Sequence, residues 1–100
     1  MKDQLERSIK QTMELLEQCK HGDKSSWFRN HLQRLQQASC QPAEVNEIAA
    51  EIRSVLGGMG SLSDLSLVPS AESALSIRDA HKMQWSLVKE LDDITGEILK

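Results

Sequence analysis

Two cysteines and two histidines near the start of the chain, Cys19, His21, His31 and Cys40, are of the types that bind zinc or act as nucleophiles. Structural zinc sites usually take their ligands from two closely spaced pairs, and these positions do not form two such pairs. Cys19 also falls on an apolar stripe, and nothing in the sequence orients a cysteine toward a histidine as a nucleophile would require. The sequence therefore predicts core cysteines and packing or solvent-facing histidines, with no metal site and no enzyme activity.

A glycine-rich stretch, GGMGSLSDLSLVP at residues 57–69, is the second place where chemistry is conceivable. It lacks the Gly-Lys-Ser/Thr ending of a phosphate-binding loop and the Gly-x-Gly-x-x-Gly spacing of a dinucleotide site. We expect a structural joint, in which glycines permit a tight reversal and Asp64 caps a short turn. A small-ligand or metal site here is the weakest alternative, and no cofactor is expected. The residues of this elbow are Gly57, Gly58, Met59, Gly60, Ser61, Asp64 and Leu65.

Two amphipathic helices are expected before the helix that leads into the elbow. The first should run over about residues 3–20, because apolar side chains recur every three or four positions, and Gly22 should take the left-handed closing conformation. The second should start near Ser25, with Asp23 or Ser25 as its N-cap, and end at the SCQP stretch. Its apolar face contains Phe28, His31, Leu32 and Leu35, with Trp27 at the edge.

Two further helices flank the elbow. Pro42 suits the first turn of a helix that ends at Gly57, and Ser76 with Asp79 forms a variant capping box at the start of a last, long helix to about Leu99. Amphipathic helices with short connections are typical of a bundle. The sequence thus predicts one all-α domain over residues 1–100: a compact bundle of about four helices, with the elbow before the long C-terminal helix.

Composition narrows the classes of function. The net charge of −3 argues against nucleic-acid binding, which needs clustered Lys and Arg. No apolar run approaches the roughly 20 residues of a membrane span, and the N-terminus has no apolar signal region. We expect a cytoplasmic protein with reduced thiols and no membrane association.

Acidic side chains recur on two of the expected helices. Glu44, Glu47 and Glu51 form a strip beside the apolar face of the third helix, which is either a solvated face or a surface for a basic partner. The last helix repeats the pattern, and its carboxylates near the C-terminal end are disfavoured by the helix dipole, so solubility or a partner must explain them. This second set consists of Asp79, Glu90, Asp93 and Glu97.

Trp85 lies off the main apolar face of the last helix. Two interpretations remain open from the sequence. The elbow covers the indole, or the indole anchors an interface, as tryptophans often do in binding hot spots.

The segment IRSVLGGMGSLSDLSL, following a Trp-containing helix SSWFRNHLQRL, resembles a family of small uncharacterised bacterial helical proteins. Their shared pattern is an amphipathic helix ending in Gly-Gly-Met-Gly-Ser, two variable residues and Asp-Leu. The resemblance covers roughly Leu5 to Leu67, and the matched positions look architectural.

Small acidic helical proteins of this kind resemble immunity proteins, which neutralise a bacterial toxin by occluding it. The resemblance therefore implies a cytoplasmic protein that binds another protein, a cognate toxin domain. An acidic face would cover a basic toxin cleft, with Trp85 as an anchor. The alternative is a structural or regulatory helical module that forms a homodimer.

Overall fold

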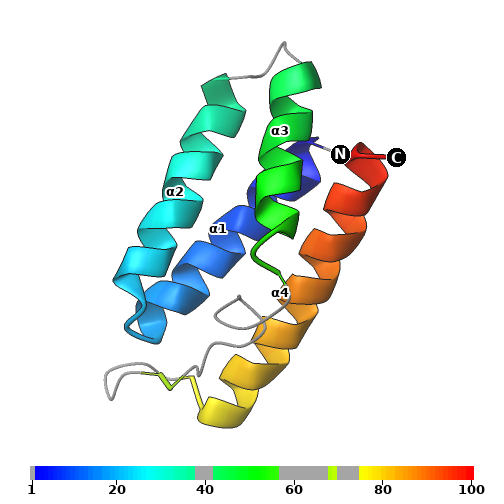
Figure 1. Cartoon of the computed structure of the whole chain (residues 1–100). Helices are drawn as coiled ribbons and strands as arrows, with labels where there is room; N and C mark the ends of the chain where they lie inside the picture. Colours follow the sequence, from blue (N-terminus) through cyan, green and yellow to red (C-terminus); the bar gives the residue numbers. More distant parts are fainter. Residues whose placement is uncertain (1, 38–41, 57–67, 70–74) are drawn as a thin grey trace.

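The computed structural model describes residues 2–37, 42–56, 68–69 and 75–100, which form four α-helices (Figure 1). They are α1 (Lys2–Gln18), α2 (Gly22–Gln37), α3 (Pro42–Arg53) and α4 (Ile77–Ile98). The helix α1 packs against α2 and α4, and α3 packs against α4 and α2, so the four helices enclose one core. The predicted all-α bundle is confirmed. The elbow lies outside the described residues.

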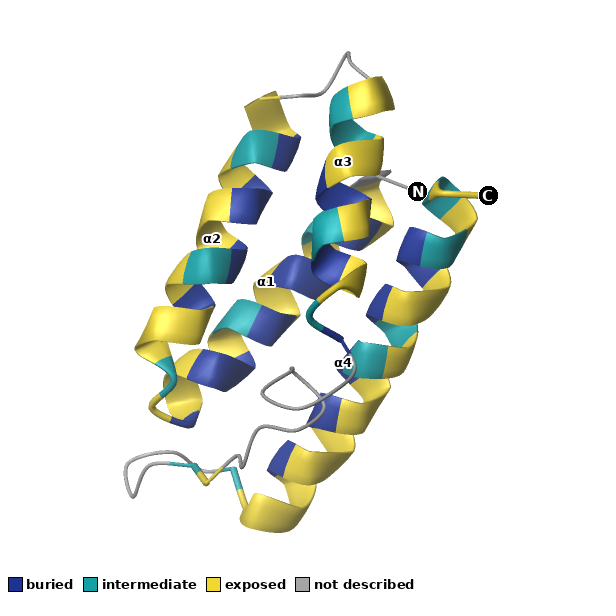
Figure 2. Cartoon of the chain, viewed as in Figure 1, coloured by how far each residue is buried: buried dark blue, intermediate teal, exposed yellow. Residues whose placement is uncertain are grey.

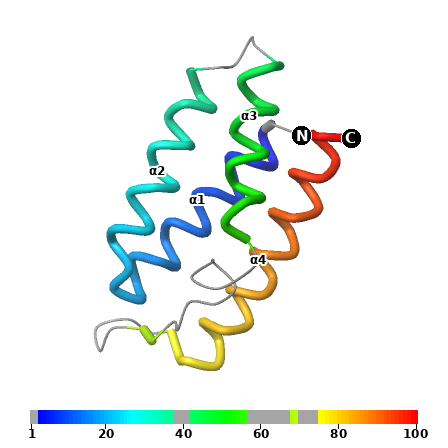
Figure 3. Tube along the Cα trace, viewed as in Figure 1, coloured from blue at the N-terminus to red at the C-terminus, as the bar shows by residue number. Residues whose placement is uncertain are grey.

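The core is built from one apolar face of each helix, as the inward-facing buried positions in Figure 2 show. Burying a leucine or isoleucine side chain contributes about 1.5–3 kcal/mol each, so this face holds the bundle together. The start of α1 and the end of α4 lie at the same end of the bundle (Figure 3). No helix among the described residues is long and apolar enough to cross a membrane. The residues with no exposed surface include Leu5, Ile9, Leu16, Leu35, Ile48, Ile52 and Leu91.

The junction between α1 and α2 differs from the prediction. Lys20, not Gly22, takes the left-handed conformation, with a φ of 63°. The N–H of His21 donates to the carbonyl of Leu16 at 2.8 Å, and the N–H of Lys20 donates to that of Glu17 at 3.3 Å. This pair of bonds closes the helix in a Schellman motif that reverses the chain within very few residues. Gly22 is therefore free to start α2 three residues earlier than expected.

Ser25 consequently lies inside α2 and is not its N-cap. Its side chain is buried, and Oγ donates to the carbonyl of Met13 at 3.3 Å and to the carboxylate of Glu17 at 3.2 Å. The predicted cap is thus a tether between α1 and α2.

The local signals of the sequence place the start of α4 correctly and the end of α3 three residues too late. Ser76 has extended backbone angles and accepts a hydrogen bond from the N–H of Asp79 at 3.1 Å, which confirms the predicted N-cap of α4. The helix α3 ends at Arg53, before the expected Leu56, because the N–H groups of Val55 and Leu56 bond to carbonyls three residues back. This tightened turn still buries Leu56 against the core.

Ser8 offers a test of the packing of α1. Its Oγ is buried and has no hydrogen-bond partner among the described residues. A buried hydroxyl without a partner costs free energy, so we expect Ser8→Ala to leave the free energy of unfolding unchanged or raise it by up to about 1 kcal/mol. Urea denaturation measures this change.

Thr95→Val is the control for Ser8→Ala. Thr95 is also fully buried, but its Oγ1 donates to the carbonyl of Leu91 at 2.7 Å. It also accepts from Arg53 at 3.3 Å, so valine should lower the stability. A Ser8→Ala protein that loses as much stability as the control would show that the Ser8 hydroxyl has a partner.

Candidate protein-binding surfaces

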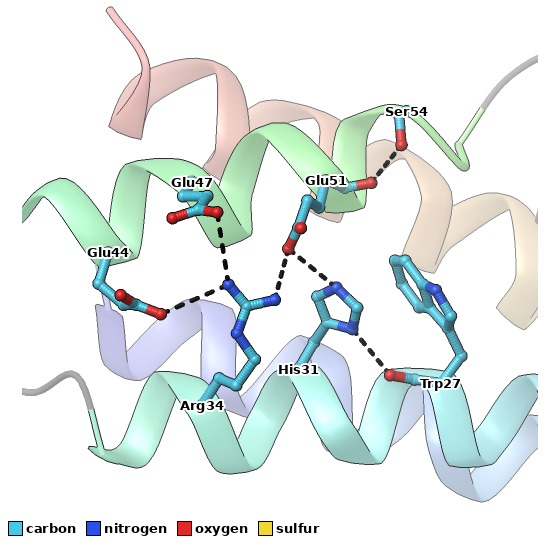
Figure 4. Close-up of polar contacts among 7 residues, drawn as sticks. All are labelled: Trp27, His31, Arg34, Glu44, Glu47, Glu51 and Ser54. Atoms are coloured by element: carbon cyan, nitrogen blue, oxygen red, sulfur yellow. Dashed lines mark hydrogen bonds and ion pairs between the residues drawn. The ribbon is translucent and has the colours of Figure 1, made fainter.

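The acidic strip of α3 faces α2, where Arg34 lies between its carboxylates (Figure 4). Nη1 of Arg34 donates to Glu51 Oε2 at 2.7 Å, and Nη2 donates to Glu44 Oε1 at 3.4 Å. Glu47 is more distant, with its Oε1 3.9 Å from Nη2 and its side chain 62% exposed. The three predicted residues are therefore brought together around a cation from the chain itself.

His31 adds a second contact to the same carboxylate. Its Nδ1 lies 2.8 Å from the carbonyl of Trp27, which only accepts, so Nδ1 donates there. Its Nε2 lies 3.1 Å from Glu51 Oε2, and the imidazole stacks on the Trp27 indole at 3.8 Å between ring centroids. We call His31, Arg34, Glu44, Glu47 and Glu51 the α2–α3 ion-pair cluster.

The contacts of Arg34 within this cluster favour the charged form of its guanidinium. The side-chain hydrogen bond from Arg34 to Glu51 is the main cause that raises the pKa of the guanidinium, desolvation lowers it, and the charge of Glu51 and the contact with Glu44 raise it further. Arg34 therefore stays positive and offsets part of the negative charge of the strip. Glu51 in particular joins α2 to α3, so a partner protein would have to compete with Arg34 for it.

The second acidic set behaves differently. Asp79, Glu90, Asp93 and Glu97 lie along the outer side of α4, and three of the four are exposed. Only Glu97 forms an ion pair among the described residues, at 3.9 Å from Lys100. We call these residues the α4 acidic stripe. Its carboxylates are available to a basic partner, unlike those of the α3 strip.

Trp85 has a 68% exposed side chain, the largest exposed fraction among the described large apolar residues. An interface anchor requires such exposure, and whether Trp85 is one stays a prediction; the elbow, which the other interpretation places over the indole, lies outside the described residues. An open pocket of about 410 Å³ lies beside it, between α4 and the turn after α3. The pocket is lined by Arg53, Leu56, Trp85, Val88, Lys89 and Asp92.

The residues considered for chemistry are used in packing where the structure describes them. Cys19 is buried in the core, and burial raises the pKa of its thiol, which keeps the sulfur protonated and unreactive. His31 is held by Trp27 and Glu51 as described above. Within the described ranges, no three His, Cys, Asp or Glu residues converge as metal ligands. Cys40 lies outside those ranges.

Arg34 and His31 are the site residues that the sequence interpretation missed. Both lie on α2, three residues apart, and thus on one side of that helix. A short connection between α2 and α3 makes the two helices antiparallel neighbours, and that signal places the α2 side chains opposite the α3 strip.

Together these features define a small all-α protein, with four helices in the described residues and with an acidic stripe and an exposed tryptophan on the last of them. The chain belongs to the family described as Domain of unknown function (DUF6966), which matches residues 17–76, more than half of its 100 residues. Neither the comparison with curated proteins nor that with solved structures gives a match.

The family match refines the predicted resemblance. It includes the elbow motif, but it starts at Glu17 where the resemblance was expected from Leu5, and it continues beyond Leu67 to Ser76, the N-cap of α4. The α4 acidic stripe and Trp85 lie after the matched residues. The family description contains nothing about immunity, which stays a prediction.

Proposed function

We propose that this chain is an immunity-type protein, which acts in the cytoplasm by binding a toxin domain and occluding it. The observation that carries the proposal is the exposed side of α4, where Asp79, Glu90 and Asp93 have no ion pair within the described residues and lie on the same helix as an exposed tryptophan. Complementary charge speeds association and sets specificity, and an exposed aromatic side chain supplies buried area once the partner arrives.

Helix energetics support a binding role for this stripe. Asp93 and Glu97 are like charges four residues apart, close to the negative end of the α4 dipole, and the last turn contains no basic residue. Each of these placements costs a few tenths of a kcal/mol, roughly. Lys100, which pairs with Glu97, and Lys89, four residues before Asp93, offset part of this cost, and a basic partner would offset more of it.

The structure also changes which acidic surface we assign to the partner. The α3 strip is engaged by Arg34 and His31, so its carboxylates already stabilise the fold. We therefore assign the toxin contact to the α4 acidic stripe and Trp85, and we expect the α3 strip to contribute little.

The experiment is affinity capture of the tagged chain from its native lysate, followed by mass spectrometry and binding measurements with the captured protein. One stoichiometric partner with toxin activity that the chain suppresses supports immunity. A chain that captures only itself and elutes as a dimer in light scattering supports the homodimeric module instead.

Asp93→Lys separates binding from stability. A lysine at position 93 complements the helix dipole and pairs with Glu97 but repels Lys89, four residues earlier, so we expect the free energy of unfolding to change by less than about 0.5 kcal/mol. The same change should slow association with the partner about tenfold at low salt, because an attractive charge becomes repulsive.

Glu14→Lys is the matched control for Asp93→Lys. Glu14 is exposed on α1 and undergoes the same change of net charge, so the association rate should change much less. Equal effects of both variants on the association rate would mean that only net charge matters, and would remove the stripe from the interface.

A further inference from the structure

The pocket beside Trp85 has an apolar floor and one fixed wall. Leu56 is buried and Val88 is half-buried, and with the indole they offer an apolar surface next to solvent. Arg53 forms the wall, because its Nη1 donates to the carbonyl of Asp92 at 2.9 Å and to Thr95 Oγ1 at 3.3 Å. A rigid apolar hollow beside an exposed aromatic ring is typical of the sites that receive one side chain of a partner protein.

Arg53 approaches α4 closely at a glycine. A Cβ added at Gly96 would lie 3.0 Å from Arg53 Nη1, so a side chain there would require the guanidinium to shift slightly. The same guanidinium lies 3.3 Å from the carboxylate of Asp92, and this pair contributes no net charge to the pocket. The charge that the pocket presents to a partner is therefore set by its remaining ionic residue, Lys89.

Lys89 belongs to a row of cations that runs past the pocket on α4. Arg78, Lys82 and Lys89 are four and seven residues apart, a spacing that puts them on one side of the helix, next to Trp85. All three are exposed, and none has an ion pair with a residue in the described ranges. We call them the α4 basic row. The charge next to Trp85 is thus positive, and the acidic stripe runs along the far edge of this row, because Lys89 and Asp93 are four residues apart.

We propose that the Trp85 pocket binds an apolar side chain from an acidic segment of a protein partner, whose carboxylates pair with the α4 basic row. The apolar side chain covers Leu56, Val88 and the indole, and the acidic neighbours of that side chain neutralise the lysines. This inference rests on the proposed function, because it specifies the chemical character of the partner segment that contacts Trp85.

Charge complementarity selects this occupant over two others. A second copy packed antiparallel and symmetrically about Trp85 would bring the two basic rows together, and like charges in contact are destabilising. A nucleic acid would pair its phosphates with the lysines but would leave the apolar floor of the pocket uncovered.

The test is a titration of the ¹⁵N-labelled full chain with short synthetic peptides, read by NMR. The first peptide has a central Phe-Leu pair flanked by Asp and Glu, and two others replace the flanks by Lys or by Ser. Trp85→Phe assigns the Trp85 indole signal. We expect the acidic peptide to shift the signals of Trp85, Leu56 and Val88, and to bind at least about tenfold more tightly than the other two.

Charge reversal at the basic row provides the decisive comparison. Lys82→Glu/Lys89→Glu should weaken the acidic peptide at least about tenfold, whereas Lys10→Glu/Lys24→Glu, with the same change of net charge on α1 and α2, should not. No shift at Trp85 with millimolar acidic peptide, equal binding of the basic peptide, or a preference for single-stranded oligothymidylate would each overturn the inference.

The failures of the two proposals can be told apart. A captured toxin that depends on Asp93 but not on Lys82 and Lys89 refutes the acidic segment and keeps the immunity function. If the chain binds the acidic peptide specifically but captures no toxin, the pocket assignment is kept and the immunity function is refuted.

Discussion

Replacing Trp85 by alanine is expected to weaken binding of the partner protein by at least about 30-fold. An exposed tryptophan beside an apolar pocket buries a large area on binding and is the residue type most enriched in hot spots. The free chain should unfold at the same urea concentration as before, because 68% of the side chain is already exposed and little packing is lost. Calorimetric titration with the captured partner and urea denaturation measure the two quantities.

The second tryptophan is the natural control for Trp85. Trp27 lies edge-to-face on Phe28 at 4.9 Å between ring centroids and stacks on His31. Trp27→Ala should therefore lower the free energy of unfolding by about 1–3 kcal/mol and leave the partner affinity of the folded fraction unchanged. If Trp85→Ala destabilised the chain and kept its affinity, the indole would be a packing residue and not an anchor.

Reversing Glu51 to lysine is expected to destabilise the bundle, with a fall in melting temperature of about 4–8 °C. Glu51 receives Arg34 and His31 from α2, and a lysine there would face two positive or hydrogen-donating groups across the same interface. The loss should appear as weaker attachment of α2 to α3. Thermal unfolding followed by circular dichroism measures the melting temperature.

Glu47→Lys is the matched comparison on the same helix. Glu47 lies 3.9 Å from Arg34 and is 62% exposed, whereas Glu51 lies 2.7 Å away and is 40% exposed. The melting temperature of Glu47→Lys should change little, because exposed ion pairs contribute about 0–1 kcal/mol. If instead both reversals left stability intact and abolished partner binding, the α3 strip would be the interface and the assignment to α4 would be wrong.

The helices of this protein could be predicted from sequence because their signals are local. Apolar side chains at intervals of three or four residues, Pro42 at a helix start and Ser76 as an N-cap each act within one turn of the chain. The boundary between α1 and α2 was less predictable, because Lys20 adopts a conformation that glycine usually takes. The propensity of one residue was outweighed there by two closing hydrogen bonds and the packing of Ser25 on α1.

The sequence was sufficient to name the residues of the candidate site, but not to predict which of them contact side chains of another helix. The wheel positions of Glu44, Glu47 and Glu51 were sufficient to group them, and those of the α4 acidic stripe likewise. Whether a carboxylate is free or paired depends on side chains from another helix, as Arg34 shows. The same holds for Trp85, whose exposure depends on what packs over α4 and not on its own helix.

The sequence by itself determined that this chain forms amphipathic helices that enclose one core, and which face of each helix is apolar. These properties follow from periodicity and capping, which act over a few neighbouring residues. The tertiary structure alone decided that Arg34 of α2 holds the acidic strip of α3, while no residue of another described helix pairs with the α4 acidic stripe. It also decided that Trp85 borders a pocket with an apolar floor, because the distance between charges on different helices is fixed only when the helices pack.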